Sequence, residues 1–473
     1  MLEISEKEIL RGLRQDNPWW ESAGVPVASE FSKKRAYFER FKDVALNWEV
    51  RRSIILMGPR RVGKTVMLKQ LIRQMIEEGF PRKSLLFVSM DTPLYSGMSP
   101  ERILELFEKH ANLASSERRV VILDEIQYLK NWEVHLKVLT DRYPTTRFIA
   151  SGSAAAALRL KSLESGAGRF TDFFLPPLTF AEYLKFSDLE SELIAPGEGM
   201  KLLCRAKDID RLNAAFIDYL NVGGYPEAVM NPSVRANPEQ FLGRDIIDKV
   251  LLRDLPSLYG IQDTQELNRL FMTIAYHSGQ EINLDNLAKS SGVAKNTISR
   301  YLEYLEAAFL IVRVRRVDDN GRTFQRERHF KAYLTNPSMR AALFTPLRDG
   351  DEALGNMAET AVFSQYFHTN QMKNIFYARW KSGRQDREVD MVLIDPATRR
   401  PLWAYEIKWS DRFADHPEEL KGLIEFAKKN EPLHIPPEAS TKTRTEETTV
   451  DGVVIRHVPC ALHCYQIGRY VAR

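Results

Sequence analysis

The stretch Gly58-Pro59-Arg60-Arg61-Val62-Gly63-Lys64-Thr65 decides the fold of this 473-residue chain. It matches the pattern GxxxxGK[ST] in full. It follows the apolar run 53–57 and precedes residues 66–78, whose apolar side chains recur at helical spacing. A glycine-rich turn between a strand and a helix is the context that confirms this pattern as a phosphate-binding loop. The stretch therefore predicts a P-loop.

The residue types of this loop explain how it would hold ATP. Glycines let backbone N–H groups face phosphate oxygens, and the N-terminus of the following helix adds positive potential. We expect Lys64 to reach the β- and γ-phosphates and the Thr65 hydroxyl to bind Mg²⁺. The expected ATP-binding residues of the loop are Gly58, Pro59, Arg60, Arg61, Val62, Gly63, Lys64 and Thr65.

A second acidic segment follows about sixty residues after the loop. The four apolar residues 120–123 predict a buried strand, and Asp124 and Glu125 come at its carboxyl end. Ligands of α/β sheets bind at that end of the strands. We expect Asp124 to hold Mg²⁺, directly or through water, and Glu125 to polarise the attacking water.

Strands and helices alternate around this site. Apolar runs at 84–90 and 147–150 predict two more strands, and 101–113 predicts a helix, so a parallel sheet covered on both faces is expected. The helices expected over residues 1–50 carry the aromatic anchors Trp19, Trp20 and Trp48. The expected fold class is α/β, with a P-loop parallel sheet, a helical and winged-helix middle part, and a C-terminal restriction-endonuclease-like α/β part.

Two further residues are candidates for the ATP site. Ser153 follows the strand at 147–150 and is expected either to sense the γ-phosphate or to belong to a simple turn. Arg169 follows Gly166 and Gly168 in an expected loop. It is either an arginine finger, in cis or from a neighbouring subunit, or an exposed solvated side chain.

The middle of the chain predicts a winged helix. Residues 284–294 read as a helix and a Gly-containing turn, and 296–305 read as a recognition helix followed by a β-ribbon. Its expected apolar face is Ile298, Tyr301, Leu302 and Leu305. Residues 311–331 hold seven basic and three acidic side chains, a surplus that suits DNA phosphates. The alternative is a protein-binding module or an ATPase lid.

The C-terminal part predicts a nuclease-like site. Glu359 lies on an expected helix, Asp390 on an expected strand, and Glu406 and Lys408 stand two apart at the end of another strand, which puts them on one face. The three carboxylates would hold Mg²⁺, and Lys408 would act on the attacking water or the transition state. A fold that keeps this outline without cutting is the alternative. The stretch 431–451 reads as a loop.

Bulk properties bound the class of protein. The net charge of +4 neither demands nor excludes nucleic acid, and three cysteines do not make a disulfide framework. The N-terminus lacks the apolar core of a signal peptide, and no stretch reaches the length of a membrane span. We expect a cytoplasmic protein with no membrane partner. The late cluster His457, Cys460, His463 and Cys464 matches no common zinc spacing, so a structural role is expected.

Beyond these motifs, nearly the whole chain resembles the bacterial and archaeal AAA-type ATPases with a C-terminal domain similar to PD-(D/E)xK nucleases. The resemblance rests on NPWW at 17–20, GPRRVGKT, LDE at 123–125, SGS at 151–153, Gly168-Arg169, PLTFAEY at 177–183, GGYPE at 223–227, Glu359, Val389-Asp390 and Glu406-Ile407-Lys408. The sequence departs at Ala154, where the family often has a second serine. PLTFAEY is expected to pack a helix onto the ATPase core.

The resemblance implies an ATPase module, a winged-helix module and a nuclease-like module. We expect an ATPase core with a helical extension at 1–177, a helical lid or linker at 178–265, a winged helix at 266–345 and a nuclease-like domain at 346–473. The expected function is Mg-ATP hydrolysis coupled to a Mg²⁺-dependent deoxyribonuclease in DNA processing or sensing. The alternative is a regulatory ATPase switch that binds a protein partner and does not cut. A homo-oligomer is compatible with both.

Overall fold

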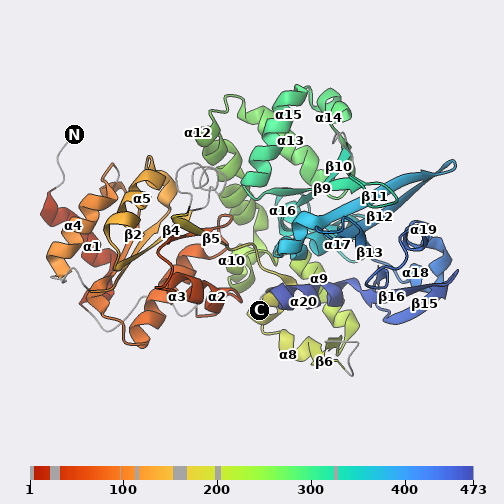
Figure 1. Ribbon diagram of the computed structural model, residues 1–473, viewed down its shortest axis with the longest axis horizontal. Helices are drawn as coiled ribbons and strands as arrows, with labels where there is room; N and C mark the ends of the chain where they lie inside the picture. The colour runs from red at the N-terminus through yellow and green to blue at the C-terminus, as the bar shows by residue number, and fades with distance from the viewer. Residues whose placement is uncertain are drawn as a thin grey trace. The chain divides into compact units, whose positions relative to one another are not determined.

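A five-stranded parallel sheet forms the centre of the first of two units, which divide after Pro176 (Figure 1). The computed structural model describes residues 5–21, 32–95, 97–111, 117–152, 168–197, 204–323 and 329–471. The strand order is β2-β3-β4-β1-β5. The strands are β1 Ser53–Met57, β2 Leu85–Ser89, β3 Arg119–Asp124, β4 Thr146–Gly152 and β5 Phe170–Phe174. The parallel sheet predicted from the sequence is confirmed.

The helices of the first unit connect these strands. They are α1 Glu6–Asp16, α2 Phe38–Ala45, α3 Lys64–Glu77, α4 Pro100–Ala111 and α5 Trp132–Arg142, with short 3₁₀ turns such as η1 Pro18–Trp20 between them. All five residues of β1 and all six of β3 are buried, as expected for strands covered on both faces. The continuous apolar runs in the sequence come from this double burial.

The edge strand β2 is closed by side chains of the N-terminal segment. The Asn17 amide donates to the carbonyl of Phe87 at 2.9 Å and accepts from its N–H at 2.6 Å. The indoles of Trp19 and Trp20 both donate to the carbonyl of Leu85, at 3.2 and 2.7 Å. Unpaired strand edges are binding templates for other strands, and here side chains satisfy them. The predicted anchoring role of Trp19 and Trp20 is confirmed.

The second unit, from Pro177 to Ala472, is built on a nine-stranded mixed sheet. Its order is β15-β16-β14-β13-β12-β11-β9-β10-β8, so strands β8 to β10 join the later strands through the parallel pairing of β9 with β11. The strands are β8 Glu281–Asn283, β9 Ile311–Val317, β10 His329–Leu334, β11 Ile375–Ser382, β12 Gln385–Ile394, β13 Pro401–Glu406, β14 Glu438–Thr441, β15 Glu446–Val450 and β16 Val453–Pro459.

Helices pack on the sheet of the second unit and bury a large core. α17 and α20 contribute Ala358, Val362 and Cys464 to it, beside Tyr377 and Tyr405 of the sheet. The principal helices are α7 Phe180–Phe186, α9 Ile209–Val222, α13 Thr264–Tyr276, α14 Leu284–Ser291, α15 Lys295–Ala307, α17 Ala353–Tyr366, α19 Lys421–Lys429 and α20 Cys460–Val471. A segment with π-helical turns covers Glu239–Asp248 and Val250–Asp254.

The prediction of a loop over residues 431–451 is wrong, because β14 and β15 lie within this stretch. β14 pairs in parallel with β13 on one side and β16 on the other, and its residues Ala439 to Thr441 are buried. Its sequence EAST carries no strong strand signal. Burial between two neighbours decides the outcome, which is how tertiary context overrides weak β-propensity.

The expectation that PLTFAEY packs onto the ATPase core is also wrong. α7 contributes Phe180, Tyr183 and Leu184 to the core of the second unit. The N–H of Leu178 donates to the carbonyl of Gly224 at 2.8 Å. A Cβ on Gly224 would lie 2.2 Å from the amide oxygen of Asn336, so only glycine fits there. The segments PLTFAEY and GGYPE are therefore in direct contact within the second unit.

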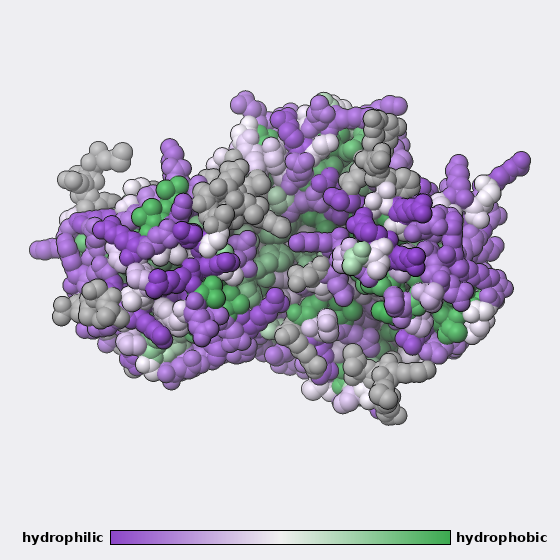
Figure 2. All heavy atoms as spheres, viewed as in Figure 1, coloured by the Kyte–Doolittle hydropathy of each residue, from purple (hydrophilic) through white to green (hydrophobic). Residues whose placement is uncertain are grey.

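Most side chains on the face in Figure 2 are hydrophilic. Across the described ranges, none of the helices combines the length and apolar character that a bilayer crossing requires.

Candidate functional site

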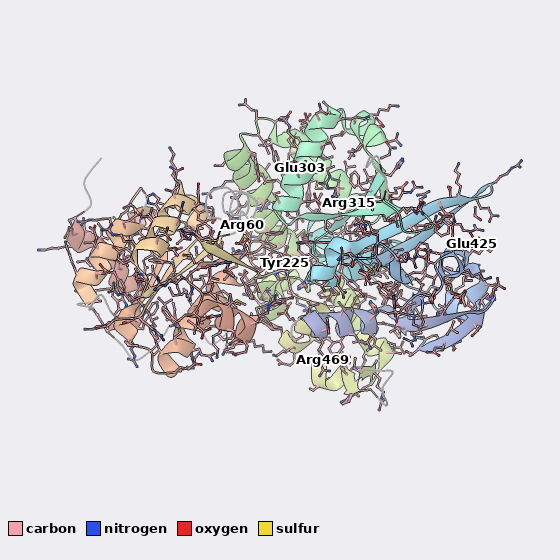
Figure 3. The ribbon with its side chains drawn as sticks, viewed as in Figure 1. Arg60, Tyr225, Glu303, Arg315, Glu425 and Arg469 are labelled. Atoms are coloured by element: carbon pink, nitrogen blue, oxygen red, sulfur yellow. The ribbon has the colours of Figure 1, made fainter. Side chains whose placement is uncertain are left out.

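The P-loop lies at the carboxyl edge of the first unit's sheet, directly after β1. The strand order places β4 between β1 and β3, so the ends of these three strands are neighbours. A Cβ on Gly58 would lie 2.1 Å from the carbonyl oxygen of Leu175, and Gly63 has a φ of 95° at the start of α3. Both positions require glycine. Arg60 lies in the loop between β1 and α3 (Figure 3).

Lys64 folds back over its own loop. Its ammonium donates to the carbonyls of Gly58 at 3.0 Å and Pro59 at 2.7 Å, and the residue is only 5% exposed. A buried ammonium that bonds to main-chain oxygens can exchange them for phosphate oxygens without a large movement. The loop backbone is fixed by Arg35, which donates to the carbonyl of Val62 at 2.7 Å.

Asp124 is the polar centre of this edge. The Thr65 hydroxyl donates to its Oδ2 at 2.7 Å, and the Ser151 hydroxyl donates to its Oδ1. Burial raises the pKa of Asp124, and the two hydroxyl donors oppose that rise. Residues from the ends of β3 and β4 and from the start of α3 thus converge on one carboxylate. The role of Ser151 was not predicted, although it stands in the SGS segment that the sequence singles out.

These oxygens suit the Mg²⁺ ion that accompanies ATP. Mg²⁺ is commonly held by one or two protein oxygens together with water and substrate phosphates, rather than by a full protein cage. The Thr65 hydroxyl and the Asp124 carboxylate supply such a pair. The structure thus places the two residues predicted to bind Mg²⁺ within hydrogen-bond distance of each other.

Glu125 follows Asp124 in a left-handed conformation, with a φ of 52°. Such a backbone is uncommon for a residue other than glycine and is found at functional sites. The side chain of Gln127 donates to the Glu125 carboxylate, and the Glu125 N–H points to Ser151 Oγ at 3.4 Å. Glu125 therefore lies at the same sheet edge as Asp124, as predicted.

Arg169 lies at the amino ends of the strands, whereas the P-loop lies at their carboxyl ends. It directly precedes β5, and β5 begins beside Ser53 at the start of β1, whereas the P-loop follows the end of β1. Its guanidinium pairs with Asp141 at 2.7 Å. The geometry contradicts a finger acting in cis, because the side chain starts from the wrong end of the strand. A finger in trans stays a prediction, and Ser153 lies outside the described residues.

The helix, turn and helix predicted in the middle of the chain are α14 and α15. Ile298, Tyr301, Leu302 and Leu305 are buried, so the predicted apolar face of α15 is confirmed. β9 and β10 follow α15 and pair antiparallel with each other, and β8, which directly precedes α14, pairs antiparallel with β10. Asn296 and Arg300 are exposed.

The basic residues of 311–331 are only partly available to a ligand. Arg313 pairs with Glu306, and Arg316 donates to the carbonyl of Arg379 at 2.8 Å. Arg315 lies on β9 (Figure 3). Arg326 and Arg328 lie outside the described residues. Lys331 is buried at 4% exposure, so its expected contact with phosphates is wrong.

The four residues predicted for the C-terminal site lie in one cluster. Met391 pairs with Tyr405, which puts Asp390 beside Glu406 on neighbouring strands. Lys408 lies 2.7 Å from Glu406 Oε1 and 3.4 Å from Asp390 Oδ2. Glu359 reaches the same place from α17. The predicted convergence of these side chains is confirmed.

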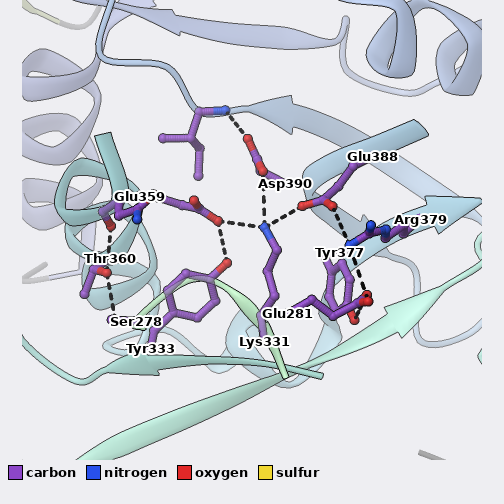
Figure 4. Close-up of polar contacts among 12 residues, drawn as sticks. Ser278, Glu281, Lys331, Tyr333, Glu359, Thr360, Tyr377, Arg379, Glu388 and Asp390 are labelled. Carbon is purple, nitrogen blue, oxygen red and sulfur yellow. Dashed lines mark hydrogen bonds and ion pairs between the residues drawn. The ribbon is translucent and has the colours of Figure 1, made fainter. Parts of the chain in front are cut away.

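Lys331 of β10 and Glu388 of β12 are members of the cluster that the sequence did not reveal. Figure 4 shows the ammonium of this lysine among the carboxylates of Glu359, Glu388 and Asp390. Lys331 is a lone charge between Phe330 and Ala332 in an otherwise apolar strand. An inward-facing charge in such a strand is a detectable signal, because buried charges are normally paired.

The electrostatics of this cluster follow from burial and pairing. Burial raises the pKa of Glu406 to about 7, helped by the nearby charge of Asp390 and opposed by Lys408. Burial alone would raise the pKa of Asp390, yet Lys408 and Lys331 bring it below its usual value. Burial would lower the pKa of Lys408, but Asp390 and Glu406 raise it. Both lysines are therefore held as cations.

The cluster does not fit a divalent metal as it stands. Within the described ranges, no three His, Cys, Asp or Glu side chains are arranged to hold a metal ion. Oxygens of Glu359 and Asp390 are taken by the ammonium of Lys331, and Glu406 Oε1 is taken by Lys408. The metal ligands predicted from the sequence therefore lie together, but their oxygens contact the ammonium groups of Lys331 and Lys408.

The late His and Cys residues are all buried. His463 is buried against Tyr405 at a ring distance of 4.5 Å, and burial lowers its pKa to about 4. Cys460 and Cys464 are buried free thiols.

Two family models match parts of this chain. Residues 50–184 match the AAA domain family, and residues 213–351 match a domain of unknown function. An uncharacterised protein of Haemophilus influenzae is 24% identical over 275 residues, which cover 57% of this chain and 64% of that protein. One from Methanocaldococcus jannaschii is 23% identical, covering 60% and 61%. The chain thus spans less than two thirds of these relatives.

Solved structures show weaker similarity. A Walker-type ATPase of Pyrococcus abyssi is 15% identical with a TM-score of 0.42, covering 68% of this chain and 99% of that one. AMPPCP-bound DnaA from Aquifex aeolicus is 12% identical with a TM-score of 0.31, covering 59% and 92%. These TM-scores are too low to define the fold of the whole chain. The parallel sheet and the P-loop of the first unit lie within the segment 50–184 that matches the AAA domain family, and this match supports an AAA-type P-loop ATPase.

Proposed function

We propose that this chain binds and hydrolyses Mg-ATP at the carboxyl edge of the first unit's sheet. The observation that carries the proposal is the convergence of Thr65 and Ser151 on the buried carboxylate of Asp124, one residue before Glu125. Lys64 and the loop N–H groups would hold the phosphates, and Thr65 and Asp124 would hold Mg²⁺. Glu125 would orient the attacking water, since phosphoryl transfer depends mainly on positioning and charge stabilisation.

The test compares the wild type with Lys64→Ala. We expect the variant to lose Mg-ATP affinity in calorimetry and at least about 100-fold in hydrolysis, because one preorganised charge contact is removed. Lys137→Ala, an exposed lysine on α5, is the matched control and should behave like the wild type. Equal ATP turnover by Lys64→Ala and the wild type would contradict the proposal.

We further propose that the ATP cycle drives a conformational change relayed to the second unit, with DNA as the partner of the winged-helix segment at 266–345. Support comes from α15, whose buried face leaves Asn296 and Arg300 exposed in the manner of a recognition helix. Arg313 and Arg316 make contacts inside the unit, so α15 would make the principal DNA contacts. A homo-oligomer is part of this proposal if Arg169 acts in trans.

For the C-terminal cluster we propose a nuclease-like module that does not cut. The specific observation in its favour is the set of ammonium groups that hold the expected metal ligands. The competing candidate is a Mg²⁺-dependent deoxyribonuclease, favoured by the co-location of Glu359, Asp390, Glu406 and Lys408. A cleavage assay on duplex DNA with Mg²⁺, with and without ATP, decides between them. Cleavage that Lys408→Ala abolishes would establish the nuclease.

A further inference from the structure

The side chain of Lys331 lies at the centre of the C-terminal carboxylate cluster. Its Nζ is 2.7 Å from Glu388, 2.9 Å from Glu359 and 3.3 Å from Asp390. An ammonium group has three N–H donors, and here it meets three carboxylates. The side chain is only 5% exposed, so these contacts replace water rather than compete with it.

The carboxylates are also held from their other sides. Asp390 Oδ2 accepts from the N–H of Ile407 at 2.9 Å, and the Tyr333 hydroxyl donates to Glu359 at 2.6 Å. Arg379 lies 3.5 Å from the second oxygen of Glu388. Each of the three carboxylates therefore has a second partner besides the ammonium of Lys331.

Lys331 belongs to β10, yet its ammonium contacts Asp390 of β12, a strand that is not a neighbour of β10 in the sheet. Two strands, β9 and β11, stand between β10 and β12 in the sheet order. Neighbouring strands are about 4.8 Å apart, so a flat sheet would separate β10 from β12 by about 14 Å, more than a lysine side chain spans. The sheet must therefore curl around this site. The Lys331 ammonium lies over the ring of Tyr377, a residue of β11, at 5.6 Å from the ring centroid.

We infer that Lys331 is a resident cation that occupies the place of a divalent metal ion in the C-terminal cluster, and that the cluster consequently excludes such ions. Divalent cations need oxygens at about 2.0–2.6 Å, and three of the available carboxylates converge on the ammonium instead. A buried cation that is removed leaves uncompensated carboxylates, and these would recruit a replacement. The inference builds on the proposed non-cutting role. It is tested by cation binding and not by cleavage, so the two can fail separately.

The experiment titrates the full chain with Mn²⁺ in the absence of nucleotide and measures bound ion by electron paramagnetic resonance. We expect the wild type to show no site that depends on Asp390, so that wild type and Asp390→Asn bind alike. Lys331→Met should gain one Mn²⁺ site that the wild type lacks, and Lys331→Met/Asp390→Asn should lose it. Lys373→Met, an exposed lysine in the same unit, should behave like the wild type.

Two results would overturn the inference. One is a wild-type Mn²⁺ site that Asp390→Asn removes, because the cluster would then hold metal despite the lysine. The other is a folded Lys331→Met chain, judged by circular dichroism, that gains no site. If Lys331→Met does not fold, the comparison of wild type with Asp390→Asn decides alone: equal binding supports the inference, and a loss in Asp390→Asn contradicts it.

Discussion

The hydroxyl of Thr65 lies 2.7 Å from Oδ2 of Asp124, although 59 residues separate them in the chain. One begins α3 and the other ends β3, and the sheet order makes their strands near neighbours. This contact joins the phosphate-binding loop to the acidic strand end. The Mg²⁺ site that we propose is therefore a property of the assembled sheet and of no single motif.

Thr65→Ala should weaken the dependence of ATP affinity on Mg²⁺. The variant removes one Mg²⁺ oxygen and one donor to a buried carboxylate, each worth about 1–3 kcal/mol. We expect Mg-ATP affinity to fall about tenfold or more while metal-free ATP binding changes little, measured by calorimetry with and without Mg²⁺. Thr273→Ala, at an exposed helix position, serves as control. An unchanged Mg²⁺ dependence would exclude Thr65 as a ligand.

Glu125→Gln should separate ATP binding from hydrolysis. The amide keeps the shape of the side chain but cannot accept a proton from water, and general-base contributions are typically about 10²–10⁴-fold. We expect near-normal ATP affinity and a turnover reduced by about that factor. Calorimetry measures the affinity, and an assay of phosphate release measures the turnover. Glu77→Gln on α3 changes an exposed glutamate and should have no effect. Loss of binding together with turnover would point to a structural role for Glu125.

Glu438→Gln should flatten the pH dependence of stability. Burial raises the pKa of Glu438 from 4.5 to about 7. Between these values the unfolded chain releases a proton that the folded chain keeps, so the contribution of Glu438 to stability is greatest below pH 4.5 and is lost as pH rises toward about 7. The loss is at most roughly 3 kcal/mol, and glutamine removes it. Denaturant unfolding at pH 5 and pH 7 measures this difference.

The matched control for that experiment is Glu418→Gln, which changes a glutamate with a 62% exposed side chain. Its unfolding curves should shift with pH as those of the wild type do. If Glu438→Gln shows the same pH slope as the wild type, Glu438 ionises normally in the folded protein.

Arg300→Ala should reduce the salt dependence of DNA binding. An arginine that contacts one phosphate adds about 0.9 to the slope of log affinity against log salt, so the variant should lose about one unit of slope. Duplex binding by fluorescence anisotropy at two salt concentrations measures it. Arg269→Ala changes an exposed arginine on α13 and should leave the slope unchanged. No salt-dependent binding by the wild type would favour a protein partner.

The first unit was predictable because its signals are local. β1 and β3 are continuous apolar runs buried on both faces, and the glycines of the P-loop are fixed by close backbone approach and by a positive φ. The sequence could not separate Ser151 from Ser153, because the choice depends on where β4 ends. It also could not show that Arg169 starts from the wrong edge, since that follows from the position of β5 beside β1.

The second unit was predictable only in part. The order of Glu359, Asp390, Glu406 and Lys408 forecast their convergence, because alternation along neighbouring strands fixes which side chains share a face. Lys331 was missed because no motif connects it with residues up to 77 positions later, and only the curl of the sheet brings them together. β14 was missed because its burial comes entirely from its two neighbours.

The contacts of Asn17, Trp19 and Trp20 with β2 have a practical consequence. The AAA family match begins at residue 50, yet the side chains that bond to the free edge of β2 belong to residues 17–20. A protein expressed from residue 50 onward would leave β2 with bare main-chain groups and would tend to aggregate through them. A fragment designed to keep the edge of β2 covered therefore has to include Asn17 and the tryptophan pair.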